Sequence, residues 1–188
     1  MTKQSFIHGT LILIIAGMIT RLLGFVNRMV TARLMGEEGI GLYMLTMPTL
    51  FLLLTLSQIG LPIAVAKRIA EANALGDSYR VRKILRLSLF IITCTSLFFM
   101  ICLIIGAPFI ANYLLTDDRV LYPLLALAPA IPIIAIASVI KAYFQGLQNM
   151  KPQSFALIIE QIIRIAAVFL LVSLLLPFGI VHAATAAV

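Results

Sequence analysis

Residues 87–113 read LSLFIITCTSLFFMICLIIGAPFIANY and contain no charged side chain. About 20 predominantly apolar residues are enough for a helix to cross the ~30 Å hydrocarbon core of a bilayer. This stretch is longer than that, and the basic residues Arg82, Lys83 and Arg86 stand directly before it. The sequence therefore predicts a transmembrane helix with a basic flank.

The composition of the whole chain agrees with a membrane protein. Of its 188 residues, 62% are hydrophobic and 11% are charged, and the mean hydropathy is +1.13. Soluble domains average about 45–50% apolar and about 25% charged residues. These values exclude a water-soluble single domain and intrinsic disorder. They also exclude nucleic-acid binding through a basic stripe, because long apolar runs separate the 14 Lys and Arg residues.

Turn and charge signals on both sides of this helix predict an all-α, polytopic membrane helix bundle over 1–188. The expected elements are five spans at about 5–32, 40–66, 84–113, 121–146 and 153–176, an interfacial helix at about 67–75, and the start of a sixth helix at 183–188. Glycines and acids predict an exposed loop at 33–39. Pro48 and Pro62 are expected to kink the second span.

The end of the interfacial helix has its own signal. Gly76 follows the last helical residues and is expected to end the helix as the C′ residue. Asp77 or Ser78 is then expected to cap the next helix. The sequence therefore predicts a tight helix-to-helix turn here.

The basic residues of the connections are unevenly divided. The N-terminus and every second connection hold Lys3, Lys67, Arg68, Arg80, Arg82, Lys83, Arg86 and Lys151. The remaining connections hold only Arg33 and Arg119, each close to acids. Because cytoplasmic loops carry the excess of Lys and Arg, we expect a multi-pass protein of the cell membrane with a cytoplasmic N-terminus.

Two arginines lie inside the first expected span. Arg21 and Arg28 are seven positions apart and project from nearly the same side of a helix, on a stripe of small and polar residues. In one interpretation Arg28 snorkels to the outer headgroups while Arg21 pairs with an acid elsewhere. In the other, both face a cavity that takes an anionic substrate, and Arg21 is the better candidate because it lies deeper.

The fourth and fifth spans also carry charges. Glu160 and Arg164 have the spacing and order of a helical ion pair. This pair either neutralises itself to permit burial or forms a cavity wall whose arginine is free for substrate when Glu160 is protonated or engaged elsewhere. Lys141 either snorkels at the cytoplasmic end of its helix or contacts a phosphate at the cytoplasmic entrance.

Other chemistry has no sequence support. His8 and His182 lie far apart and offer no metal-ligand spacing. No phosphate-binding loop or nucleophile elbow is present. We therefore expect no enzyme activity, no catalytic residue, no metal and no cofactor.

Several motifs in combination resemble the stage V sporulation protein B family, within the multidrug, oligosaccharidyl-lipid and polysaccharide exporter group. They are GTLILIIAGMITRLLGFVNR at 9–28, ARLMGEEGIGLY at 32–43, GLP at 60–62 followed by AVAK at 64–67, and YFQGLQNMKP at 143–152 followed by EQIIR at 160–164. The resemblance implies two helical lobes with alternating access. Its implied substrate is a sugar unit on a polyprenyl pyrophosphate, here a peptidoglycan precursor for the spore cortex. Arg21 matches a cavity arginine of the related lipid II flippases, and a second such arginine falls on Asn27.

The resemblance covers most of one lobe, so the partners it implies are a lipid-linked anionic substrate, the lipid bilayer, and a missing C-terminal lobe or a second membrane subunit. No nucleic-acid partner is expected. The first hypothesis for the function is a flippase of lipid-linked sugar precursors in sporulation. One alternative is a multidrug or organic cation exporter, which would favour acidic residues facing the cavity. Another is a truncated membrane fragment that does not transport.

Overall fold

The computed structural model describes residues 6–115 and 117–175, and every regular element in this part of the chain is a helix. The helices are α1 (Phe6–Gln58), α2 (Leu61–Ala74), α3 (Ser78–Phe109), the π-helix η1 (Ile110–Leu114), the 3-10 helix η2 (Asp118–Val120), α4 (Leu121–Leu127), α5 (Ala130–Gly146) and α6 (Lys151–Leu175). The expected all-α fold class is confirmed for the described residues.

Four stretches of the described chain are long and apolar enough to cross a membrane. They are Ile14–Arg33, Gly39–Ala74, Ser78–Leu114 and Leu121–Gly146. The fifth expected span, 153–176, falls on α6, which is not among these four, and its last residue lies outside the described residues. The expected start of a sixth helix at 183–188 also lies outside them.

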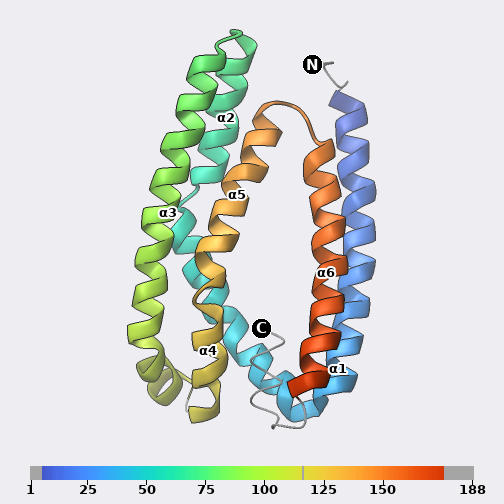
Figure 1. The fold of residues 1–188 in the computed structure, drawn as a ribbon, viewed down its shortest axis with the longest axis vertical. Helices are drawn as coiled ribbons and strands as arrows, with labels where there is room; N and C mark the ends of the chain where they lie inside the picture. The colour runs from blue at the N-terminus through green and yellow to red at the C-terminus, as the bar shows by residue number, and fades with distance from the viewer. Residues whose placement is uncertain (1–5, 116, 176–188) are drawn as a thin grey trace.

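The first two expected spans are two helical segments, labelled together as α1, that meet at a kink at Gly36 without the loop expected at 33–39. In Figure 1 the first part of α1 runs down beside α6, and its second part rises behind α4 and α5. Gly36 is the non-helical residue inside α1, with φ 68° and ψ −172°. Only glycine adopts this combination without strain. The chain therefore reverses at a single residue, where the acids and glycines predicted a loop of seven residues.

The second expected span, 40–66, is interrupted. α1 ends at Gln58, and Ile59 and Gly60 both have positive φ, 43° and 70°. Pro62 lies in the first turn of α2, where a missing N–H costs nothing, so it helps to start a helix and does not kink one. The residues expected as a separate interfacial helix, 67–75, continue α2 without a break through Ala74.

The turn between α2 and α3 matches its sequence signals. Gly76 has φ 72°, and its N–H donates to the carbonyl of Asn73 at 3.1 Å. The N–H of Asp77 donates to the carbonyl of Ala72 at 3.0 Å, which completes a Schellman motif. The carboxylate of Asp77 accepts from the N–H of Arg80 at 2.9 Å. Both the C′ glycine and the capping aspartate are thus confirmed.

Two apolar clusters hold most of the bundle together. One joins α2, α3 and α5 and includes the fully buried side chains of Ile69, Ile92 and Val139. The other joins α4, α3 and the second part of α1, around Leu103 and Leu124. α6 packs chiefly along α1 and makes few contacts with α5 (Figure 1). α5 and α6 therefore make few direct contacts, although the second cluster includes a residue from each of them.

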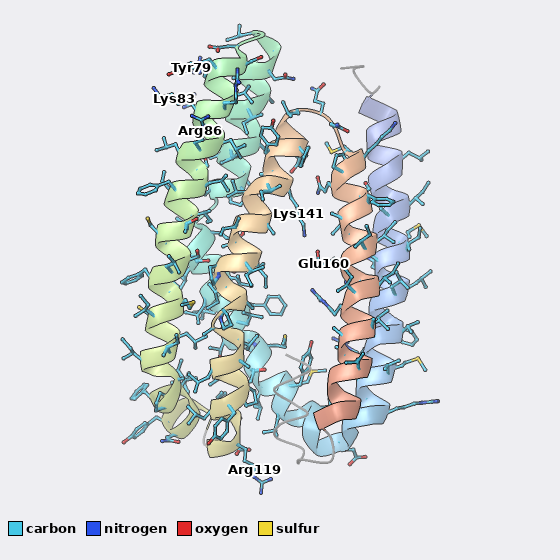
Figure 2. The ribbon with its side chains drawn as sticks, in the orientation of Figure 1. Tyr79, Lys83, Arg86, Arg119, Lys141 and Glu160 are labelled. Atoms are coloured by element: carbon cyan, nitrogen blue, oxygen red, sulfur yellow. The ribbon has the colours of Figure 1, made fainter. Side chains whose placement is uncertain are left out.

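The basic residues collect at one end of the bundle. The start of α1, the α2–α3 turn and the α5–α6 connection lie at the same end, while the reversal of α1 and the α3–α4 connection lie at the other (Figure 1). Figure 2 shows Lys83 and Arg86 near the first end and Arg119 at the opposite one. We call the first the basic end; among its described residues are Lys67, Arg68, Arg80, Arg82, Lys83, Arg86 and Lys151.

Candidate functional site

A cavity of about 160 Å³ lies between α6 and the two parts of α1. Its lining residues are Gly24, Asn27, Arg28, Thr31, Ile40, Tyr43, Met44, Gln161 and Arg164. The reversal at Gly36 explains how α1 supplies two walls, since residues equally far from the turn, such as Arg28 and Met44, come to face the same space. The α6 side chains close the third side. We call this space the α1–α6 cavity.

Three residues expected at a substrate site, Asn27, Arg28 and Arg164, line the α1–α6 cavity. Two arginines thus line it, one from α1 and one from α6. A guanidinium offers five donors in a fixed fork that matches the oxygens of a carboxylate or phosphate. The cavity therefore has the charge and the donor geometry to hold an anion.

Two amide side chains add hydrogen-bond acceptors. Among the described residues, no donor reaches Asn27 Oδ1 or Gln161 Oε1, although both atoms are buried. A buried acceptor without a partner costs about 1–3 kcal/mol, so such atoms usually mark a site that a polar ligand or water completes. The cavity can therefore bind hydroxyl or amide donors beside an anionic group.

Glu160 joins two cations across the space between α5 and α6. Arg164 Nη2 donates to Glu160 Oε1 at 3.0 Å, and Lys141 Nζ donates to Glu160 Oε2 at 3.1 Å. Figure 2 shows Lys141 and Glu160 directed toward one another from α5 and α6. The helical pair between Glu160 and Arg164 is confirmed. With two cations and one anion, this ion-pair network keeps a net positive charge next to the cavity.

Lys141 forms a contact that neither of its two sequence interpretations included. Its side chain is 34% exposed and is engaged by Glu160, which lies 19 positions away in the sequence. The antiparallel course of α6 beside α5 brings the carboxylate within reach, and no local sequence pattern reports such a contact. Lys141 therefore connects α5 to α6 through an ion pair.

Arg21 does not line the α1–α6 cavity. It is exposed on α1, about 10 Å along the helix from Arg28 and closer to the basic end. In the described part of the chain neither Arg21 nor Arg28 forms an ion pair. The acid that one interpretation gave as a partner of Arg21 is therefore not found there.

Tyr43, Met44 and Gln161 line the cavity without having been expected as site residues. Gln161 had a usable signal, because it is polar in an apolar helix and follows Glu160 directly. Tyr43 and Met44 had none until the reversal at Gly36 placed them opposite Arg28.

No group of three or more His, Cys, Asp or Glu residues within the described ranges could hold a metal ion.

The sequence matches a known protein family over nearly all of its length. The model of the polysaccharide biosynthesis protein family matches residues 6–188. The chain belongs to the polysaccharide biosynthesis protein family. No solved structure gives a significant match to it. Family membership and the apolar helices together identify a multi-pass membrane protein.

Three curated proteins of Bacillus subtilis (strain 168) are similar to this chain. Stage V sporulation protein B is 53% identical over all of this chain and 36% of its own length. Sporulation protein YkvU is 32% identical over 88% of this chain and 36% of its own length. Lipid II flippase MurJ is 30% identical over 90% of this chain and 32% of its own length. The expected resemblance to the stage V sporulation protein B family is confirmed. The chain spans about a third of the length of these relatives.

The contact between α5 and α6 can be tested through Glu160. Glu160→Gln removes the charge that holds Lys141 and Arg164, so we expect the α5–α6 distance distribution to broaden without unfolding. Exposed ion pairs contribute only about 0.2–1 kcal/mol each, so the change is expected to shift the populations of α5–α6 distances and not to unfold the chain. Spin labels at Gln145 and Ala156, in a background without Cys94 and Cys102, report this distance by pulsed electron resonance.

The matched control is Glu71→Gln, which removes an ion pair to Arg68 at 3.4 Å on α2. It is expected to leave the α5–α6 distance distribution unchanged. Identical distributions for the unmodified chain and Glu160→Gln would show that the ion-pair network does not restrain the two helices.

Proposed function

We propose that this chain is part of a flippase for polyprenyl-pyrophosphate-linked sugar precursors, with the peptidoglycan precursor of the spore cortex as its substrate. The observation that carries the proposal is the α1–α6 cavity, in which Arg28 and Arg164 converge beside two unpartnered amide oxygens. Support comes from the similarity to stage V sporulation protein B and to a protein named as a lipid II flippase.

The cavity suits the charged part of such a substrate. Its volume of about 160 Å³ equals that of about five liquid waters, enough for a phosphate-sized group and too little for a whole oligosaccharide. Arg28 and Arg164 hold the pyrophosphate oxygens, and Asn27 and Gln161 accept hydrogen bonds from the attached sugar. The apolar polyprenyl chain stays against lipid, where α1 exposes large side chains such as Leu22 and Phe25.

Access to the cavity follows from the charge asymmetry of the bundle. We assign the basic end to the cytoplasm and the protein to the cell membrane, because cytoplasmic connections retain Lys and Arg. Arg21 lies on α1 between the basic end and the cavity, so an anionic head group entering from the cytoplasm passes it. Lys141 and Glu160 border the same approach from the α5–α6 side.

Transport in this proposal is shared with a second unit. Residues 1–188 form part of the N-terminal lobe, and the other wall of the transport path comes from a C-terminal lobe or a second membrane subunit. The relatives support this, since the chain covers only 36% of stage V sporulation protein B. The substrate crosses the membrane without a covalent step, and the unit is a transporter with no catalytic residue or cofactor.

Competition binding separates this proposal from the organic cation exporter. The purified chain in neutral detergent is loaded with a fluorescent polyprenyl-pyrophosphate disaccharide. An unlabelled substrate of the same class is expected to displace it, and an organic cation such as tetraphenylphosphonium is not. Displacement by the cation alone would favour an organic cation exporter, and absence of binding by the lipid-linked sugar would contradict the assigned substrate class.

A further inference from the structure

The first turns of α3 carry a basic face that lies apart from the α1–α6 cavity. A surface hollow of about 550 Å³ is lined by Tyr79, Arg82, Lys83, Arg86 and Leu87. These residues are spaced by three or four positions, so they share one side of the helix. A neighbouring hollow of about 410 Å³ is lined by Tyr79, Lys83 and Leu87 among others and adds Arg80. We call this surface the α3 basic face.

The cations of the α3 basic face are not neutralised by the protein. In the described part of the chain no carboxylate pairs with Arg80, Arg82, Lys83 or Arg86. Arg82 Nε donates to the carbonyl oxygen of Ser78 at 3.3 Å, which leaves its charge uncompensated. All four are exposed. Like charges gathered this closely attract an anion from their surroundings.

The depth of this face in the bilayer follows from the length of the apolar part of α3. From Leu87 to Phe109 the helix rises about 34 Å, which matches the ~30 Å hydrocarbon core. Arg82, Lys83 and Arg86 then lie about 2 to 8 Å outside the hydrocarbon. That is the depth of the headgroups, since the polar layers add about 10–15 Å in total to the core.

The hollow also combines basic side chains with exposed apolar and aromatic ones, as a lipid site requires. Leu87 is 57% exposed at the point where the basic residues end, and Phe90 continues the apolar surface at 69% exposed. Tyr79, 74% exposed, adds an aromatic ring with a hydroxyl at the polar side. Figure 2 shows Tyr79, Lys83 and Arg86 together at the basic end of α3. A soluble phosphate or nucleic acid would use the cations but not the apolar side chains.

We propose that the α3 basic face binds the headgroup of an anionic phospholipid in the adjoining leaflet. Arg82, Lys83 and Arg86 contact the phosphate, and Leu87 packs on the first methylenes of the acyl chains. The hydroxyl of Tyr79 donates to the headgroup oxygens. This site is independent of the transported substrate, and it holds whether or not the α1–α6 cavity binds a lipid-linked pyrophosphate.

Titration with labelled lipids tests the site. The chain in neutral detergent is titrated with fluorescent phosphatidylglycerol and, separately, phosphatidylcholine with the same tails, and binding is followed by anisotropy. We expect phosphatidylglycerol to bind more tightly. Each basic residue near a membrane surface contributes about 1 kcal/mol, or about fivefold. The triple variant Arg82→Gln, Lys83→Gln, Arg86→Gln should therefore weaken phosphatidylglycerol binding on the order of 100-fold and leave phosphatidylcholine binding nearly unchanged.

The matched control removes the same charge elsewhere at the basic end, with Lys67→Gln, Arg68→Gln and Lys151→Gln. It is expected to weaken phosphatidylglycerol binding less than about tenfold. An equal loss in both triple variants would overturn the proposal, since net charge alone would then explain the preference. If the α3 triple variant fails to fold, Lys83→Gln alone is expected to lose about fivefold, and unchanged binding in that variant would overturn the proposal as well.

Discussion

Replacing Arg28 and Arg164 together with glutamine is expected to lower the affinity for a polyprenyl-pyrophosphate-linked sugar by about 100-fold. The two guanidinium groups are the only cations that line the α1–α6 cavity among the described residues. A hydrogen bond to a charged group contributes about 1.5–3 kcal/mol, and the lower figure applies here because the Arg164 side chain is 51% exposed. The measurement is the dissociation constant of the chain in neutral detergent.

Two further variants make this result specific. Lys67→Gln with Lys151→Gln removes the same charge outside the cavity and is expected to leave the affinity within about threefold. Arg21→Gln removes an arginine that lies beside the approach and not in the cavity, so its loss should be smaller than that of the double variant. If the outer pair weakened binding as much as Arg28 and Arg164 do, the cavity would not be the anion site.

Gly146→Ala is expected to destabilise the bundle more than the same change at Gly17, Gly24, Gly41 or Gly106, where an added Cβ meets no atom closer than 4.0 Å. A Cβ at this position would lie 2.7 Å from the carbonyl oxygen of Ala66 and 2.8 Å from Cβ of Ile69, so α5 would have to move away from α2. Overpacking of this kind typically costs about 1–3 kcal/mol. For a chain of this size we expect the midpoint of thermal unfolding in detergent to fall by about 2–12 °C.

The control for this change is Gly17→Ala. A Cβ at Gly17 meets no atom within 4 Å, and alanine is the better helix former. Its unfolding midpoint should stay the same or rise slightly. Equal midpoints for the two variants, measured by temperature-dependent size-exclusion chromatography, would show that α2 and α5 are not in close contact at Gly146.

The helical fold was predictable because its signals are local. The length of the apolar stretches predicts the spans. Gly76 ends α2 and Asp77 caps α3 through contacts with residues close by in the sequence. The reversal of α1 was not predictable in the same way. Gly36 is one of several glycines and acids in a row, and only its backbone angles in the folded chain show that the turn occupies one residue.

The candidate site was predictable in part. Helical periodicity placed Arg21 and Arg28 on one stripe, and of these two Arg28 lines the cavity. Spacing predicted the pair of Glu160 and Arg164. The contact of Lys141 with Glu160 joins two helices across a connection, and Tyr43 reaches the cavity only because α1 folds back. Such contacts depend on tertiary packing, and the spacing of residues along one helix contains no information about them.

Photo-crosslinking tests the central claim most directly. A polyprenyl-pyrophosphate disaccharide with a diazirine on the sugar next to the pyrophosphate is bound to the chain, irradiated, and the labelled peptides are sequenced. We predict labelling of α1 between Gly24 and Met44 and of α6 at Gln161–Arg164, and loss of this label in the Arg28→Gln, Arg164→Gln variant. Labelling confined to α3, or unchanged by the double variant, would contradict the assignment of the α1–α6 cavity as the substrate site.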